Sequence, residues 1–166
     1  MSKQLLRPPL FPSLRDEREF ASLLLSVGVR HVAVSFSGAG DSGEVDSVGF
    51  YQDSPQDDRV LRRANVADTV VPCPAFLMEQ VSPRRRSATD RTDQERLKTI
   101  ILALFNLASD RAGEDWYNNE GGFGRFVVTV LPHGGLDVSF DVSVYVRETE
   151  DYEYDMAWPV PDEGGE

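Results

Sequence analysis

Two glycine-rich segments concentrate the side chains that could do chemistry. Residues 37–43 read Ser-Gly-Ala-Gly-Asp-Ser-Gly, and residues 118–124 read Asn-Asn-Glu-Gly-Gly-Phe-Gly. Glycine permits a positive φ and the close approach of backbone to another group, and Asp and Asn hydrogen-bond their own backbone in turns. Such compositions are typical of tight turns. Because each segment has three glycines, more than a simple hairpin turn requires, they also favour a backbone shaped for binding.

The polar and aromatic side chains in and beside these segments are the candidate binding residues. They are Asp41, Ser42, Glu44, Asp115, Trp116, Asn118, Asn119, Glu120 and Phe123. The two aromatic side chains could be core anchors or the apolar walls of a site. The four carboxylates could hold a divalent cation if the two segments meet in space. No other cofactor is expected.

Neither segment matches a known phosphate or calcium loop. A P-loop requires Gly-Lys-Ser/Thr after its glycines, whereas Asp41 follows Gly40. A dinucleotide-binding turn leads into a helix, whereas a strand is predicted here. The acidic residues after Gly40 also lack the spacing of an EF-hand. These mismatches exclude the best-known loop chemistries.

The remaining reactive side chains do not assemble a catalytic motif. His31 and His133 are the only histidines, and two isolated histidines do not make a zinc site. No Gly-x-Ser-x-Gly nucleophile elbow is present. The single cysteine, Cys73, lies between two prolines and excludes an internal disulfide. The sequence therefore favours a non-catalytic protein over an enzyme.

The net charge of −11 is confined to the last third of the chain. Residues 114–166 hold 13 acidic and two basic side chains, whereas residues 1–113 hold 15 of each. Such a field disfavours contact with phosphate backbones and favours a basic partner or solubility alone. The short basic run at residues 84–86 is too small to indicate a nucleic-acid site.

The first half of the chain alternates between helix and strand signals. Ser13 with Asp16 predicts a helix N-terminus, and apolar residues at helical spacing extend the helix over 14–27. Alternating residues predict a strand at 30–37, with His31 on the face opposite its apolar side chains. A second strand follows at 44–52 and completes a β-hairpin. Short strand and helix signals follow at 69–71 and 75–81.

The second half repeats this layout of helix, strand and strand. Thr92 and Glu95 resemble a capping box and predict a helix over 93–112, with Gly113 ending it. Strands are predicted at 125–131 and 136–147, and an irregular edge strand at 148–158. No residue-level repeat accompanies the layout.

These elements predict an α+β fold, a two-layer sandwich in which two amphipathic helices cover one face of a largely antiparallel sheet. We expect an extended N-terminal arm at 1–12, one domain at 13–158, and an acidic disordered tail at 159–166. No apolar run reaches the ~20 residues that span a bilayer. Cytoplasmic residence without a membrane partner is the simplest expectation.

The two glycine-rich segments and their flanks resemble an uncharacterised family of small bacterial proteins. Its members pair a strand ending in Gly-Asp-Ser-Gly with a later Asn-acid-Gly-Gly-aromatic-Gly turn, as residues 34–43 and 116–124 do here. A hairpin and an acidic, tyrosine-rich last strand follow, with Tyr145, Tyr152 and Tyr154. The resemblance covers 30–52 and 92–156. It implies one domain, paired turns and a setting near mobile genetic elements, but no reaction.

The sequence leaves three functions open. The first is a non-catalytic interaction or regulatory module that binds a protein partner through its glycine-rich turns and acidic last third, and the charge favours a basic partner. The second is a divalent-metal-dependent enzyme that uses the carboxylates of both turns. The third is a small-ligand binder in which Trp116 and Phe123 form apolar walls.

Overall fold

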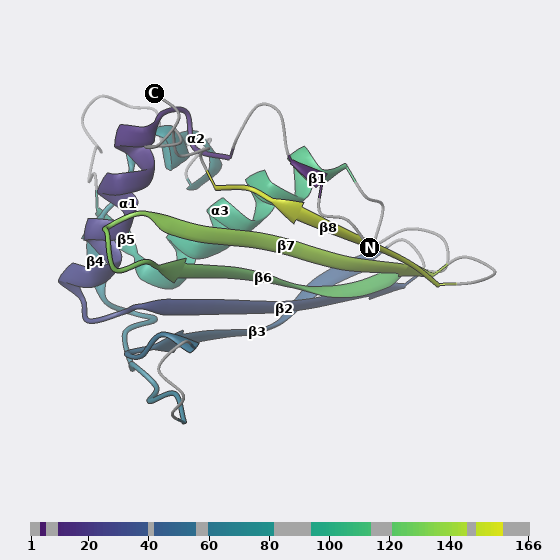
Figure 1. Ribbon diagram of the computed structural model, residues 1–166, viewed down its shortest axis with the longest axis horizontal. Helices are drawn as coiled ribbons and strands as arrows, with labels where there is room; N and C mark the ends of the chain where they lie inside the picture. Colours follow the sequence, from purple (N-terminus) through teal and green to yellow (C-terminus); the bar gives the residue numbers. More distant parts are fainter. Residues whose placement is uncertain are drawn as a thin grey trace.

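A computed structural model describes residues 4–5, 10–39, 42–55, 60–81, 94–113, 121–145 and 149–157 (Figure 1). The main sheet has six strands in the order β1-β8-β7-β6-β2-β3, and a smaller sheet pairs β4 with β5. The strands of the main sheet are β1 (Gln4–Leu5), β2 (His31–Ala39), β3 (Ser42–Tyr51), β6 (Gly122–Val130), β7 (Leu136–Tyr145) and β8 (Thr149–Asp155). Every pair in it is antiparallel except β1 with β8.

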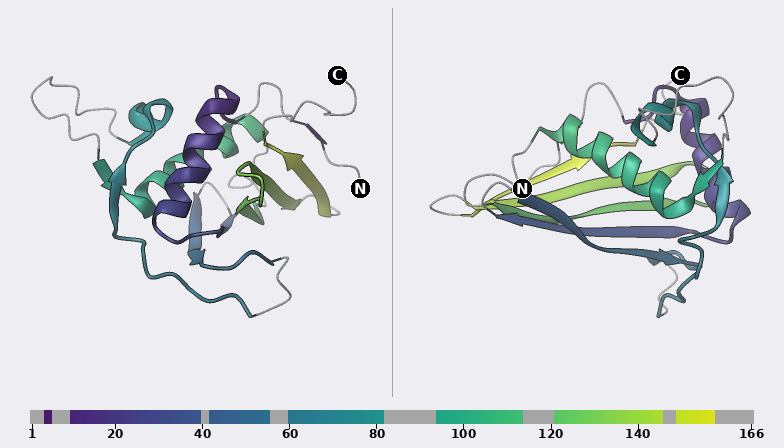
Figure 2. Two further views of the ribbon diagram at one scale, coloured as in Figure 1. Left: turned by 60° about the vertical axis from the view of Figure 1, so that its left-hand side comes forward. Right: turned by 180° about the vertical axis from the view of Figure 1, so that it is seen from behind.

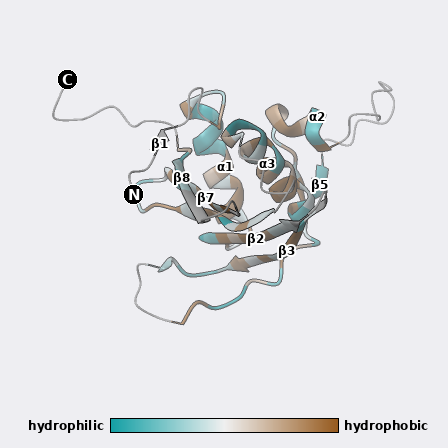
Figure 3. Cartoon of the chain, turned by 90° about the vertical axis from the view of Figure 1, so that its right-hand side faces the viewer, coloured by the Kyte–Doolittle hydropathy of each residue, from teal (hydrophilic) through white to brown (hydrophobic). Residues whose placement is uncertain are grey.

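Two helices cover one face of this sheet, which confirms the predicted α+β architecture. Helix α1 (Leu14–Ser26) and helix α3 (Leu97–Ala112) lie on the same side of the strands (Figure 2). The end-on view shows no described helix on the other side (Figure 3). The core between the layers includes apolar side chains from both helices and alternate residues of β2, β6 and β7. We call the uncovered side of the sheet the open face.

The predicted first helix and hairpin are confirmed. The Ser13 hydroxyl accepts a hydrogen bond from the amide of Asp16 at 3.1 Å, so α1 begins with the expected side-chain cap. Gly28 follows the helix with a φ of 78°, as its position predicted. The strands β2 and β3 then form the predicted hairpin. Leu10 and Phe11, which precede α1, are fully buried in the core.

The middle of the chain forms the short elements predicted there. The strand β4 (Val70–Pro72) is followed by a 3₁₀ turn η2 (Ala75–Leu77) and a short helix α2 (Met78–Val81). The strand β4 pairs with β5 (Gln94–Arg96). The basic run at 84–86 and the tail at 159–166 lie outside the described residues.

The predicted start of the second helix is wrong. Helix α3 begins at Leu97 rather than at 93, and its N-cap, Arg96, makes no side-chain cap. Residues 94–96 are instead held as β5 by pairing with β4. Carbonyls of the loop before β4 take the place of the cap. The amide of Leu97 donates to Thr69 O and the amide of Lys98 donates to Ala67 O, each at 2.9 Å. Helix α3 ends as predicted at Gly113, which is left-handed with a φ of 72°.

The prediction of an edge strand at 148–158 is also wrong in one respect. The strand β8 exists, but it lies between β7 and β1, since Gln4 pairs with Tyr154 and Leu5 with Asp155. This parallel pair joins residues from opposite ends of the sequence, and nothing in the local pattern of either segment indicates it.

Candidate functional site

The two glycine-rich segments flank each other at one end of the main sheet. In the β2–β6 pair Gly38 lies opposite Gly122, and Ser37 lies opposite Phe123. The β2–β3 hairpin turns at this end after Ala39, and the β7–β8 hairpin turns here after Tyr145. We call it the turn end; it is on the right of Figure 1. The two segments therefore meet through backbone pairing of Ser37 and Gly38 with Phe123 and Gly122.

Only part of the predicted site falls in the described residues. Glu44 is exposed on β3, Phe123 on β6 is 45% exposed, and the backbone of Ser42 begins β3. The other predicted residues lie outside the described part of the chain: Asp41, Asp115, Trp116, Asn118, Asn119 and Glu120. In the described part, no three His, Cys, Asp or Glu side chains cluster to hold a metal ion. The metal-dependent alternative uses Asp41, Glu44, Asp115 and Glu120, of which only Glu44 is described, and it stays a prediction.

The register of the sheet gathers further polar side chains beside Phe123 on the open face. Phe123 lies opposite Ser143, and Arg125 lies opposite Asp141, which in turn lies opposite Glu153. All of these positions face away from the core because the intervening residues of each strand are the ones packed beneath the helices.

A hollow of about 520 Å³ opens among these side chains. Its lining consists of Phe123, Gly124, Arg125, Asp141, Val142, Ser143, Tyr152 and Glu153. Two aromatic rings, two carboxylates, one guanidinium and two hydroxyls thus belong to the lining. The Oδ1 atom of Asp141, one of these lining side chains, is buried. We call this the turn-end hollow.

Sequence reasoning found Phe123 but missed Arg125, Asp141, Ser143 and Glu153. Alternation within 136–147 did indicate which of these positions oppose the apolar face. What it could not supply is the register between β6, β7 and β8, and a shift of one residue would place each of them on the other face.

A family model matches residues 14–156. The chain belongs to DUF6878, a family of unknown function. This confirms the resemblance to an uncharacterised family. No curated protein and no solved structure matches the chain. The match spans α1 to β8 and includes every residue of the turn-end hollow.

At the other end of the open face, this DUF6878 chain buries a histidine. His31 is 5% exposed, and its Nδ1 lies 2.8 Å from the Thr129 hydroxyl. The Tyr51 ring lies 5.6 Å from the imidazole and covers Gly49, where a Cβ would be 2.7 Å from the Tyr51 hydroxyl. Burial lowers the pKa of His31, and the charge of Arg125 lowers it further. His31 is a packed, neutral group and not part of the turn-end hollow.

This lowered pKa predicts a pH dependence of stability. In the unfolded chain His31 takes up a proton near the ordinary pKa of 6.5, whereas in the folded chain its pKa is lower. The free energy of unfolding therefore has its full value above pH 6.5 and falls as the pH drops below that value. We expect the free energy of unfolding, measured by urea denaturation between pH 7.5 and 5.5, to fall more steeply in the wild type than in His31→Gln. Equal slopes in the two proteins would contradict this assignment.

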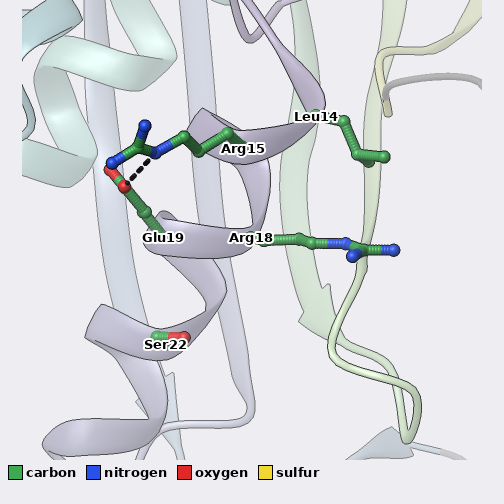
Figure 4. A pocket seen from close by; sticks show the side chains of 5 residues that line it. All are labelled: Leu14, Arg15, Arg18, Glu19 and Ser22. Carbon is green, nitrogen blue, oxygen red and sulfur yellow. Dashed lines mark hydrogen bonds and ion pairs between the residues drawn. The ribbon is translucent and has the colours of Figure 1, made fainter.

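A second hollow lies on the outer side of α1 in this DUF6878 chain. It is lined by Leu14, Arg15, Arg18, Glu19 and Ser22 (Figure 4). The Nε of Arg15 is 2.9 Å from Oε1 of Glu19, an exposed pair one helical turn apart. Figure 4 shows Arg18 pointing away from that pair. Exposed pairs of this kind contribute little, and we assign no function to this hollow. None of the described helices is long and apolar enough to cross a membrane.

Proposed function

We propose that this protein is a non-catalytic module that binds a basic segment of a partner protein at the turn end of its open face. The observation that carries the proposal is the turn-end hollow, where the exposed ring of Phe123 lies beside the carboxylates of Asp141 and Glu153. Lysine and arginine side chains combine an apolar stem with a charged head. An aromatic face beside carboxylates suits both parts.

The distribution of charge supports a basic partner. The described acidic side chains of β7 and β8, namely Asp137, Asp141, Glu153 and Asp155, occupy alternate positions that share the open face. The single basic residue described on these positions of β6 is Arg125. These four acidic side chains of the last third thus share one surface, and such a surface would attract cations and repel nucleic-acid phosphates.

The test uses an acetylated, amidated pentalysine peptide as the probe. We expect the Asp141→Asn/Glu153→Gln double variant to bind it at least about tenfold more weakly than the wild type, a loss of ~1.4 kcal/mol. The matched control is Asp68→Asn/Asp137→Asn, which removes the same charge from two exposed positions that do not line the turn-end hollow. At physiological salt, where screening acts over about 8 Å, the control should bind nearly as the wild type does.

Isothermal titration calorimetry gives the affinities, and amide chemical shifts locate the peptide. Equal losses in the two double variants would mean that the peptide responds only to net charge. Absence of binding to the wild type at about 1 mM peptide, a limit of ~4 kcal/mol, would overturn the proposal.

The volume of the turn-end hollow favours a second candidate, a small-ligand binder. About 520 Å³ lies within the ~300–1,000 Å³ typical of ligand pockets. A small organic cation would use the same ring and carboxylates as a lysine side chain. Titration with benzylamine distinguishes the two candidates, since a small-ligand site would bind it more tightly than pentalysine. Under either candidate we propose that the protein is cytoplasmic, because a chain with a single cysteine, Cys73, forms no internal disulfide.

A further inference from the structure

The outer edge of β3 is a second surface shaped for a partner. We propose that it accepts an extended segment of another protein, in which apolar and basic residues alternate, as an added β-strand. The inference goes beyond the proposed function, because it requires β3 and not the turn-end hollow.

In the part of the chain that the structure describes, half of the outer edge of β3 is unpaired. The strand β3 is the last strand of the main sheet. In the described part of the chain, only residues 62–64 pair with its outer side: Ala64 donates to Phe50 O and Gln52 donates to Arg62 O, each at 2.8 Å. No described segment pairs with residues 43–48 on that side. The existing pairing shows that this edge accepts an antiparallel neighbour.

The same hydrogen bonds identify which backbone groups point outward. Phe50 and Gln52 bond to the outer segment, while the carbonyl of Tyr51 accepts from Arg30 on the β2 side at 2.9 Å. Because backbone groups alternate in direction along a strand, the N–H and C=O of Val48 also point outward. They are the nearest donor and acceptor for an added strand.

The side chains of β3 define what that strand should carry. Val45 and Val48 are half-buried, pack against the core, and lie opposite Phe36 and Val34 of β2. An added strand would cover them with its own apolar side chains. Glu44 and Asp46 are exposed on the open face. Glu44 lies opposite Ser37, and Asp46 accepts a hydrogen bond from the Ser37 hydroxyl at 3.0 Å.

The bulge and the two carboxylates of β3 determine which strand the edge can accept. Edge strands commonly carry charges and bulges that prevent self-association, and the β2–β3 register shifts between Ser35 and Phe36, opposite Asp46. The two carboxylates repel a second copy of a chain whose net charge is −11. The same carboxylates attract a basic strand, so the edge excludes its own copy and selects a partner of opposite charge.

The test compares Val48→Pro with Val48→Ala. Proline removes the outward N–H of residue 48 and leaves the pairing with β2 intact, as is tolerated on edge strands. Alanine removes a similar part of the side chain but keeps the donor. The probe is the capped peptide Lys-Val-Lys-Thr-Lys-Val-Lys, followed by calorimetry and by the amide shifts of residues 43–48. Melting temperatures of both variants verify that they fold.

We expect Val48→Pro to weaken binding at least about tenfold and Val48→Ala by less than about threefold. N-methylation of the peptide backbone along one edge should abolish the shifts at residues 43–48. If Val48→Pro fails to fold, the N-methylated peptide alone decides the outcome. Binding that is indifferent to N-methylation, or a peptide that shifts only Phe123 and Arg125, would overturn the edge site and leave the proposed function intact. Pentalysine binding that depends on Asp141 and Glu153 tests the latter separately.

Discussion

Replacement of Phe140 by alanine should lower the free energy of unfolding by about 3–5 kcal/mol. Phe140 is fully buried on β7. Its ring stacks on Phe36 at 5.1 Å and on Phe105 at 6.0 Å, and it lies 6.4 Å from Phe126. These four rings join β2, α3, β6 and β7, so a cavity here would loosen contacts in both layers at once.

Urea denaturation followed by circular dichroism would measure this loss. Phe140→Leu is the control, because it keeps most of the buried volume and should cost clearly less than alanine. A loss below about 1 kcal/mol for Phe140→Ala would show that the layers can collapse around the cavity, and that the ring cluster is not the centre of the core.

Replacement of Gly124 by alanine should cost about 1–3 kcal/mol, the range of an overpacked core. A Cβ at Gly124 would collide with the backbone carbonyl oxygen of Asp141 and lie 2.6 Å from Cζ of Phe36. The carbonyl belongs to the paired strand β7 and cannot rotate away, and the Phe36 ring is held in the aromatic cluster. Gly124, one of the residues that line the turn-end hollow, is therefore required by close approach.

Gly135→Ala provides the matched control for this substitution. A Cβ at Gly135 would lie 2.7 Å from Cε1 of His133, but that histidine is exposed and can move. We expect Gly135→Ala to change the melting temperature much less than Gly124→Ala does. Phe36→Leu removes the ring but leaves the Asp141 carbonyl in place. Adding it to Gly124→Ala should therefore not restore the stability that the collision with this carbonyl costs. Full recovery in that double variant would mean that the ring alone required the glycine.

The sequence predicted those elements whose signals are local. Ser13 and the apolar spacing after it defined α1, alternation defined β2 and β7, and β3 followed as the second strand of the hairpin. The start of α3 was wrong because the carbonyls of Ala67 and Thr69, distant from Leu97 in sequence, replace the expected cap. The β1–β8 pair was missed for the same reason: contacts between remote segments leave no local pattern.

The residues of the candidate site also differ in whether the sequence alone could indicate them. Phe123 and Glu44 could be selected from composition because they adjoin the glycine-rich segments. Asp141 and Glu153 could not, since they come from strands whose register relative to β6 is set by packing of the whole sheet. The two turns share one surface because β2 pairs with β6. The layout of helix, strand and strand occurs twice in the sequence, but it does not indicate that these two strands pair.

That β2–β6 pair also bears on how the chain is made. It joins His31 to Thr129, which are 98 positions apart, whereas the β2–β3 hairpin and the β6–β7–β8 meander each close over short turns. Closing a long loop costs more entropy than closing a short one, and domains begin to fold as the chain leaves the ribosome from its N-terminus. The first helix and hairpin must therefore wait, with one lateral edge unpartnered, until β6 has been synthesised. During that interval the inner edge of β2 carries unpaired backbone groups, an arrangement that favours wrong strand pairing.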